Sequence, residues 1–358
     1  MKHRFPYEWT LKDANFTKDK GKVFSCFACG GGSTMGYKLA GFDVIGCNEI
    51  DPKMIEAYKA NHNPKYAYLE PIQTFKLRND LPKELYNLDI LDGSPPCSSF
   101  SMAGNREKDW GKEKKFREGQ AEQVLDNLFF DFIDLAKKLQ PKVVVAENVK
   151  GLLLGAAKDY VRRIYKAFNE AGYSLRIEPY LLDASKMGVP QRRERVFFIA
   201  IRNDLAKPFL EQVDMFQIAP KLDLNFNELP INFYEVFENN SNERQLLGEA
   251  LRLWHKRIDT DKDLENVSNR EGRPNFMFNH KFIKKSKVAN TITGNDNCCL
   301  YEEPRYRSKS ELCKCGTYPM DYDFKINKPE YLIGMSVPPV MTAQIATEIY
   351  NQWLSKLS

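Results

Sequence analysis

Short apolar runs alternate with segments of helical periodicity over the first 200 residues of the chain. The runs at 23–27, 42–47, 88–91 and 143–146 predict buried strands. Helices are predicted from about Ser33, from Pro52 after the capping residue Asp51, and over 123–139 and 158–171. Further strands are predicted at 175–182 and 196–201. This alternation predicts an α/β fold with a doubly wound, mostly parallel, Rossmann-like sheet that is closed by an antiparallel pair.

The pattern changes after Asn203. Residues 205–285 are rich in Asn, Lys, Phe and Asp without regular α/β alternation, and regular structure returns from Ala289 to a final helix at 338–354. We therefore expect a main domain at 20–204, a smaller domain at 205–285, and a C-terminal segment at 286–358 that returns to complete both.

Composition and charge narrow the class of protein. The chain has 358 residues, of which 42% are hydrophobic and 28% charged, as in globular proteins. No stretch approaches the roughly 20 apolar residues that span a bilayer, and the N-terminus lacks the apolar core of a signal peptide. We expect a cytoplasmic protein whose eight cysteines are thiols. The net charge of +5 permits nucleic-acid binding without demonstrating it.

One cysteine stands where chemistry is expected. Cys97 follows the 88–91 strand in the loop Ser94-Pro95-Pro96-Cys97, and the prolines exclude helix there. In open α/β sheets, ligands bind at the carboxyl ends of strands. The alternative is that Cys97 is a small buried hydrophobe, as free cysteines usually are. Basic residues that follow it, including Arg106, favour a polyanionic substrate, although such runs are often only solvated surface.

Two motifs predict a nucleoside site. Gly30-Gly31-Gly32 follows the first strand and opens a helix, which lets the backbone approach a ligand closely. Glu49 ends the second strand, where an acid can accept both ribose hydroxyls. A glycine cluster alone is equally typical of a flexible turn.

An acid and a group of arginines lie on later strands. Glu147 follows the 143–146 strand, and parallel order predicts that it shares a sheet edge with Cys97. Capping of the next helix is the alternative role for such an acid. Arg192, Arg193 and Arg195 precede an apolar strand, either as plain edge charges or as guanidinium forks for phosphates or a base carbonyl.

These motifs, in this order, resemble those of the DNA (cytosine-5) methyltransferases, which are class I methyltransferases, over nearly the full chain. The resemblance is carried by Phe27-Ala28-Cys29-Gly30-Gly31-Gly32, Asn48-Glu49, Pro95-Pro96-Cys97, Glu147-Asn148-Val149, Gln191-Arg192-Arg193-Glu194-Arg195, Arg305 with Ser308 and Glu311, and Gly334-Met335-Ser336-Val337-Pro338-Pro339. It implies that the segment between the arginine motif and Arg305 is the target-recognition domain.

The resemblance implies methyl transfer from S-adenosylmethionine to C5 of a cytosine flipped out of a specific duplex DNA site. Cys97 would attack C6, while Glu147 would donate a proton to N3. Arg195 would bind the O2 carbonyl, and Arg193 would contact backbone or steady the thiolate. The loop from Ser98 to about Arg117 would close over the flipped base.

The same resemblance implies two sets of binding residues. The cofactor would be held by Phe27, Ala28, Cys29, Gly31, Gly32, Glu49, Ile50, Ile72, Pro96, Ser336 and Val337. DNA would be contacted by Ser98, Ser99, Arg106, Asn148 and Gln191. We expect a monomer, with any cognate restriction endonuclease acting separately.

The chain departs from the family pattern only on the cofactor side. Ser25 stands where an acid is usual, and Cys29, Ile50 and Met335 replace a glycine, a large aromatic and an asparagine. Where an aspartate commonly meets the adenine amino group, the chain has Glu70-Pro71-Ile72, so that Glu70 or a backbone group would serve instead.

We predict no metal site, because Cys298, Cys299, Cys313 and Cys315 lack the spacing of two to four residues within each pair that is typical of zinc, and the second pair falls in a predicted helix. Two other functions are compatible with the sequence. One is a tRNA cytosine methyltransferase, and the other is a DNA-binding regulator without catalytic activity, which should have lost Cys97 and Glu147.

Overall fold

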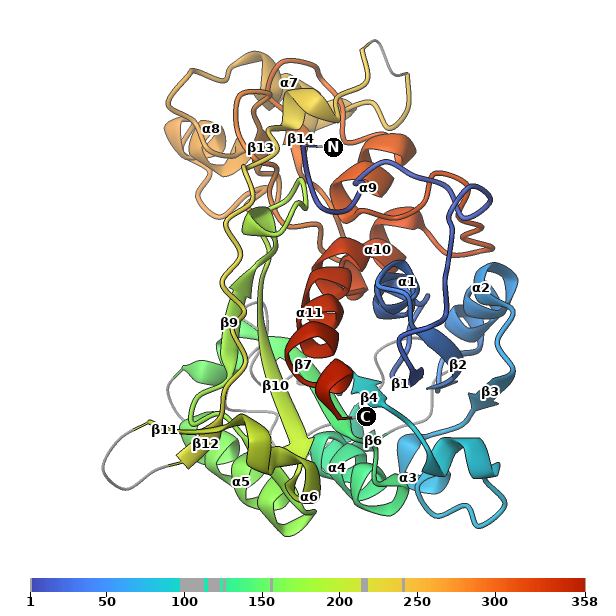
Figure 1. Cartoon of the computed structure of the whole chain (residues 1–358). Helices are drawn as coiled ribbons and strands as arrows, with labels where there is room; N and C mark the ends of the chain where they lie inside the picture. Colours follow the sequence, from blue (N-terminus) through green and yellow to red (C-terminus); the bar gives the residue numbers. More distant parts are fainter. Residues whose placement is uncertain are drawn as a thin grey trace. The chain divides into compact units, whose positions relative to one another are not determined.

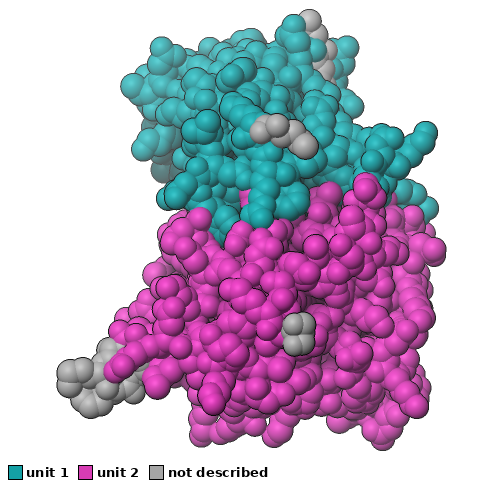
Figure 2. Space-filling view, in the orientation of Figure 1, with its two compact units in different colours: residues 1–14, 184–193, 226–341 teal, residues 15–183, 194–225, 342–358 magenta. Residues whose placement is uncertain are grey.

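The computed structural model describes residues 2–96, 113–114, 123–124, 127–154, 157–213, 218–239 and 242–357. The chain forms two compact units, each assembled from segments that are far apart in the sequence (Figure 2). Unit 1 comprises Met1–Ala14, Ala184–Arg193 and Phe226–Met341, and unit 2 comprises Asn15–Asp183, Glu194–Asn225 and Thr342–Ser358.

A twisted sheet forms the centre of unit 2 (Figure 1). Its strands are β1 (Lys22–Cys26), β2 (Asp43–Glu49), β3 (Tyr66–Leu69), β4 (Ile90–Gly93), β7 (Val143–Val149), β8 (Tyr173–Leu175), β9 (Tyr180–Asp183) and β10 (Glu194–Arg202). They are ordered β3-β2-β1-β4-β7-β10-β8, and β9 also pairs with β10. The first five strands run parallel, whereas β10 is antiparallel to β7, β8 and β9. The predicted α/β fold with a mostly parallel sheet is therefore confirmed.

Helices cover this sheet and bury its apolar strands. They are α1 (Gly32–Leu39), α2 (Pro52–His62), α3 (Ile72–Phe75), α4 (Leu128–Leu139), α5 (Ala157–Glu170), α6 (Asn203–Ala206) and α11 (Pro339–Gln352). The core joins residues of β1, β4, β7 and β10 to α4 and α5, with Phe132 and Phe198 among those fully buried. The continuous apolar run of β7 is the pattern expected of a strand covered on both faces.

Side-chain capping explains where α2 begins, whereas α4 begins only after a short strand. Asp51 caps α2 by accepting the backbone amide of Lys53, as its position before Pro52 predicted. Helix α4 begins at Leu128 rather than at Gln123, because 123–124 belong to the strand β6 (Gln123–Val124), which pairs with β5 (Glu113–Lys114). A second small pair, β11 (Leu210–Gln212) with β12 (Ile218–Pro220), also lies in unit 2.

Unit 1 is built from short elements around buried ion pairs. Its helices and strands are α7 (Gly248–His255), α8 (Leu264–Arg270), β13 (Phe282–Ile283), β14 (Cys299–Leu300), α9 (Lys309–Gly316) and α10 (Pro329–Met335). Arg305 pairs with Glu311 at 2.8 Å, and Ser308 and Glu311 form a capping box at the start of α9. Arg305, Ser308 and Glu311, which one sequence motif grouped together, therefore form one connected cluster in the structure.

The observed units differ from the consecutive ranges expected from the sequence. Residues 184–193 lie inside the expected main domain, yet they belong to unit 1, while 205–225 belong to unit 2. Local patterning cannot reveal such exchanges because they depend on contacts between distant segments.

Candidate active site

The turn from β1 into α1 has the geometry that the glycine cluster predicted. Phe27 and Cys29 have φ of 52° and 50°, and Gly31, which precedes the helix, has φ of 86°. A Cβ on Gly31 would lie 2.2 Å from Nε2 of His62, so only glycine fits there. Five of the residues expected at the cofactor site, Phe27, Ala28, Cys29, Gly31 and Gly32, lie in this one turn.

Glu49, at the end of β2, joins the second strand to this turn. Its carboxylate accepts the backbone amide of Cys29 at 2.7 Å and those of Ile50 and Asp51 at 2.8 and 2.9 Å. Burial raises the pKa of Glu49, against the lowering effect of these hydrogen bonds. A carboxylate has about four lone-pair sites, so this group can fix the turn and still accept a further donor.

The acid in the segment after β3 has partners within its own turn. The Glu70 carboxylate accepts hydrogen bonds from Arg78 at 3.0 Å and Thr74 at 3.1 Å, so it is engaged within its own turn. Ile72 is 2% exposed and belongs to the same core cluster as Phe24 and Phe75. The Glu70 carboxylate keeps acceptor positions beyond these two bonds, so the expectation that it or a backbone group serves the cofactor stays a prediction.

An acid and a guanidinium lie side by side at the edge where β4 ends. Gly93 of β4 pairs with Ala146 of β7, which places Glu147 directly beyond the end of β4. Nε of Arg195, on β10, lies 2.9 Å from Oε1 of Glu147, and the two side chains are 16% and 12% exposed. Burial lowers the pKa of Arg195, while Glu147 opposes that effect. Glu147 thus extends from a strand in an ion pair rather than capping a helix.

Asn148 ties this edge to the loop that leads to Cys97. Its Nδ2 donates to the carbonyl of Pro95 at 3.1 Å, and its Oδ1 accepts the amide of Val149 at 2.8 Å. Asn148 is 4% exposed, so its amide positions the loop from inside the protein. Cys97, Ser98, Ser99 and Arg106 lie outside the described residues, whereas Pro96 lies just within them.

Gln191 and Arg193 have internal partners in unit 1. Gln191 is 1% exposed, donates to the carbonyl of Cys315 and accepts the amide of Ile292. Arg193 is 2% exposed and donates to the carbonyls of Ile292, Gly334 and Ser336 at 3.0, 2.9 and 2.7 Å. The expected DNA contact of Gln191 stays a prediction, and its side-chain amide already has one internal partner at each end. The backbone that Arg193 contacts is that of its own chain.

Ser336 and Val337 also belong to unit 1. The Ser336 hydroxyl lies 2.7 Å from that of Tyr318 and donates to the carbonyl of Leu332, and Val337 is buried. Their place in a cofactor pocket stays a prediction.

The chain matches a known family over most of its length. The sequence model described as C-5 cytosine-specific DNA methylase covers residues 21–351. The chain belongs to this family.

Curated relatives agree with that membership, and a solved structure shares the fold. The Type II methyltransferase M.FnuDI of Fusobacterium nucleatum is 38% identical over 184 residues, 51% of this chain and 48% of the relative. M.Bsp6I of a Bacillus species is 26% identical over 353 residues, 93% and 99% of the two chains. A mutant of Spodoptera frugiperda DNMT2 has the same fold, with a TM-score of 0.63 at 18% identity and coverage of 92% and 99%. The chain spans about half the length of M.FnuDI and of M.NgoPII from Neisseria gonorrhoeae.

Within this methylase fold, one further acid lies among the candidate site residues. Asp92, the third residue of β4, is 4% exposed and accepts hydrogen bonds from Ser25, Ser33 and Tyr37. Sequence reasoning missed it. The signal that could have revealed it is a charged residue inside an apolar strand, two positions before the Ser94-Pro95-Pro96 loop.

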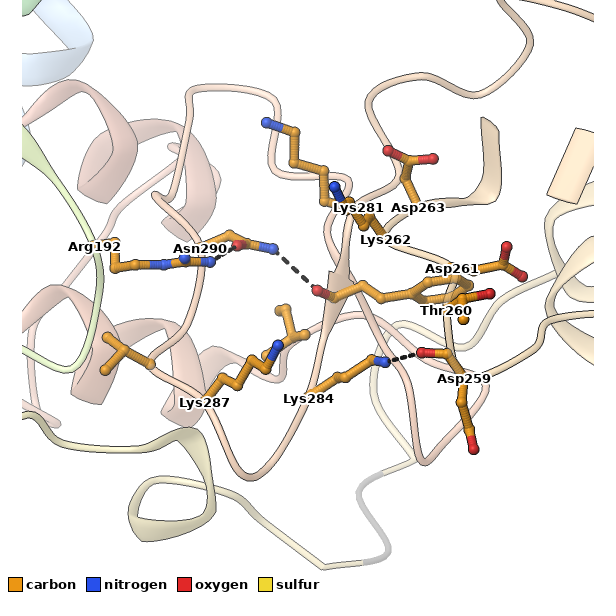
Figure 3. Close-up of a pocket in the computed structure, with 13 residues that line it drawn as sticks. Arg192, Asp259, Thr260, Asp261, Lys262, Asp263, Lys281, Lys284, Lys287 and Asn290 are labelled. Atoms are coloured by element: carbon orange, nitrogen blue, oxygen red, sulfur yellow. Dashed lines mark hydrogen bonds between the residues drawn. The ribbon is translucent and has the colours of Figure 1, made fainter. Parts of the chain in front are cut away.

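Unit 1 of the methylase contains a basic pocket of about 550 Å³ (Figure 3). Its three acids have partners: Asp259 accepts the Tyr301 hydroxyl, Asp261 pairs with Arg270, and Asp263 caps α8. Its cations are Arg192, Lys262, Lys281, Lys284 and Lys287, and among the described residues none of them forms an ion pair. The pocket therefore presents an excess of positive charge.

The four cysteines considered for zinc are buried thiols, and burial raises the pKa of Cys298 to about 12. Cys313 and Cys315 lie in α9, as predicted. Within the described part of the chain, no group of three or more His, Cys, Asp or Glu residues is arranged to hold a metal, and no helix is both long and apolar enough to cross a membrane.

Proposed function

We propose that this chain transfers the methyl group of S-adenosylmethionine to C5 of a cytosine flipped out of a specific site in duplex DNA. The observation that carries the proposal is the Glu147–Arg195 pair at the end of the strand that precedes Cys97. N3 and O2 of cytosine are adjacent on one edge of the ring. An acid and a guanidinium that lie in contact are therefore suited to bind both atoms together.

The residues present fit the cofactor. S-adenosylmethionine offers ribose hydroxyls and a cationic methionine end, and when bound it supplies an electrophilic methyl group. Glu49 and the turn from Phe27 to Gly32 would hold it, because they combine a hydrogen-bond acceptor with close backbone approach. Ile50, Ile72 and Pro96 would complete this part of the site, and the expected roles of Ser336 and Val337 stay predictions.

Cytosine C5 is a poor nucleophile, so the ring must first be activated. The Cys97 thiolate would form a bond to C6, and the electron density would move onto C5 while Glu147 donates a proton to N3. Arg195 would stabilise the charge on O2. After C5 has gained the methyl group, loss of its proton and breakage of the sulfur–C6 bond would restore the aromatic ring.

Unit 1 is proposed to recognise the DNA target, with its basic pocket binding the phosphate backbone. Support comes from the lysines along a cavity of about 550 Å³, which form no ion pair with any residue that the structure describes. Action as a monomer, and any restriction endonuclease partner, stay predictions.

A suicide substrate tests the proposal. Duplex DNA that contains 5-fluorocytosine at the methylated position should trap a covalent adduct, because the fluorine cannot leave as a proton does. Cys97→Ala should abolish both the adduct and methyl transfer while it retains DNA binding. Turnover by Cys97→Ala, or methylation of tRNA in preference to DNA in a parallel assay, would contradict the proposal.

A further inference from the structure

Asp92 is a buried carboxylate with hydroxyl partners only. Its Oδ2 accepts from Ser25 at 2.8 Å and Ser33 at 2.7 Å, and its Oδ1 accepts from Tyr37 at 3.2 Å. In the part of the chain that the structure describes, no Lys, Arg or His forms an ion pair with it. Burying a charge without an opposite charge is unfavourable, and three neutral donors compensate for only part of the lost hydration.

The other titratable groups around Asp92 supply no positive charge either. They are Tyr37 on α1, Cys26 on β1, Tyr58 on α2 and Glu147 on β7. The first three are neutral at physiological pH, since burial raises the pKa of each, and the fourth is an acid. Burial, as the largest cause, raises the pKa of Asp92 to about 6.

The position of Asp92 connects the two halves of the candidate site. Its strand pairs with β1, where Asp92 lies directly opposite Ser25, just before the turn that is expected to hold the cofactor. Ser33 belongs to the first turn of α1, at the other end of the same loop. The chain continues from Asp92 through Gly93 to the loop that carries Cys97. An uncompensated negative charge therefore lies between the cofactor turn and the nucleophile loop.

We propose that Asp92 supplies the counter-charge for the cationic methionine end of S-adenosylmethionine. This inference rests on the proposed methyl transfer and assigns a binding role that the motifs did not reveal. The ligand contributes the cation that the described residues lack. The α-ammonium group is the partner of choice, because it donates hydrogen bonds and a sulfonium does not. The acid missing at position 25 is thus provided by the residue opposite it on β4.

Equilibrium binding to the full chain tests this role, with Asp92→Asn as the variant and three ligands as probes. S-adenosylmethionine and S-adenosylhomocysteine both carry the ammonium group, whereas 5′-methylthioadenosine lacks it. We expect Asp92→Asn to weaken binding of the first two by about 10- to 100-fold, as for loss of a charged hydrogen-bond partner, and to leave the third unchanged. The proposal would be overturned if Asp92→Asn bound each ligand with the same affinity as wild type. It would also be overturned if the variant weakened the binding of all three ligands equally.

Asp89→Asn is the matched control. Asp89 precedes the same strand at its other end, and it already has a cation, Lys142, at 2.8 Å. This variant should bind all three ligands as the wild type does. If wild type itself fails to bind S-adenosylmethionine, the proposed function fails, and that result is distinct from loss of discrimination in Asp92→Asn.

A charge exchange and a proton count give independent readouts. Ser25→Asp combined with Asp92→Ser returns the carboxylate to the opposite strand and should recover binding to within a few-fold of wild type. A double variant that binds no more tightly than Asp92→Ser alone would overturn the proposal.

Calorimetry near pH 6 in buffers of different ionisation enthalpy should show proton release on binding to wild type, because a bound cation lowers the pKa of Asp92. Asp92→Asn should lack this release.

Discussion

At the scale of single residues, the buried negative charge of Asp92 lowers the stability of the folded chain. Its pKa is about 6 in the folded chain against 3.8 for an ordinary aspartate, so the folded state binds the extra proton between those values. Stability therefore falls as pH rises through this window, and the full cost, about 3 kcal/mol, is present above pH 6. We predict that Asp92→Asn melts higher than wild type at pH 8 without ligand, and that the gap closes near pH 4. Calorimetric melting at both pH values checks this; a gap that does not change with pH would contradict it.

Glu147 gives a second prediction at this scale. Glu147→Gln keeps the shape of the side chain and one acceptor beside Arg195, but it cannot carry a proton to N3 and return it. We expect kcat to fall about 10²-fold or more, as for loss of a general acid, with little change in the affinity for DNA. Single-turnover methylation and DNA titration measure the two quantities. Weaker DNA binding with unchanged kcat would instead indicate a positioning role.

At the scale of elements, the turn from β1 into α1 depends on Gly31. Gly31→Ala meets both a left-handed backbone, φ 86°, and the ring of His62, 2.2 Å from the new Cβ. Gly172→Ala is the matched control, since Gly172 has φ of 89° with nothing within 4 Å of its Cβ. We expect the control to lose about 1 kcal/mol and Gly31→Ala to lose more, together with cofactor affinity. Chemical denaturation and ligand titration of both variants measure the free energy of unfolding and the cofactor affinity. Equal losses of stability in the two variants would exclude a role for His62.

At the scale of the whole molecule, the basic pocket of unit 1 should determine how DNA binding depends on salt. Lys281 and Lys287 line the pocket without an ion-pair partner among the described residues. The double change Lys281→Ala with Lys287→Ala should lower affinity for duplexes of any sequence and reduce the slope of log K against log salt by about 0.9 per lysine. Lys325→Ala is the control, because Lys325 pairs with Asp323 and does not line the pocket. A slope unchanged in the double variant would place the DNA elsewhere.

The sequence by itself determined the main strands and helices of the central sheet and the edge at which those strands end. Apolar runs, turn glycines and the Asp51 cap are local signals. The parallel order of the strands then brings Glu147 to the end of β4, independently of the loops that connect them. The tertiary structure alone decided which side chains are free to act. Gln191 and Arg193 are buried by partners roughly 100 or more positions away, and Asp92 receives its hydroxyls from β1 and α1. Such partners are close in space but distant in sequence, so no local pattern encodes them. The charge left without a counter-ion at Asp92 becomes visible only when every neighbour of that carboxylate is in place.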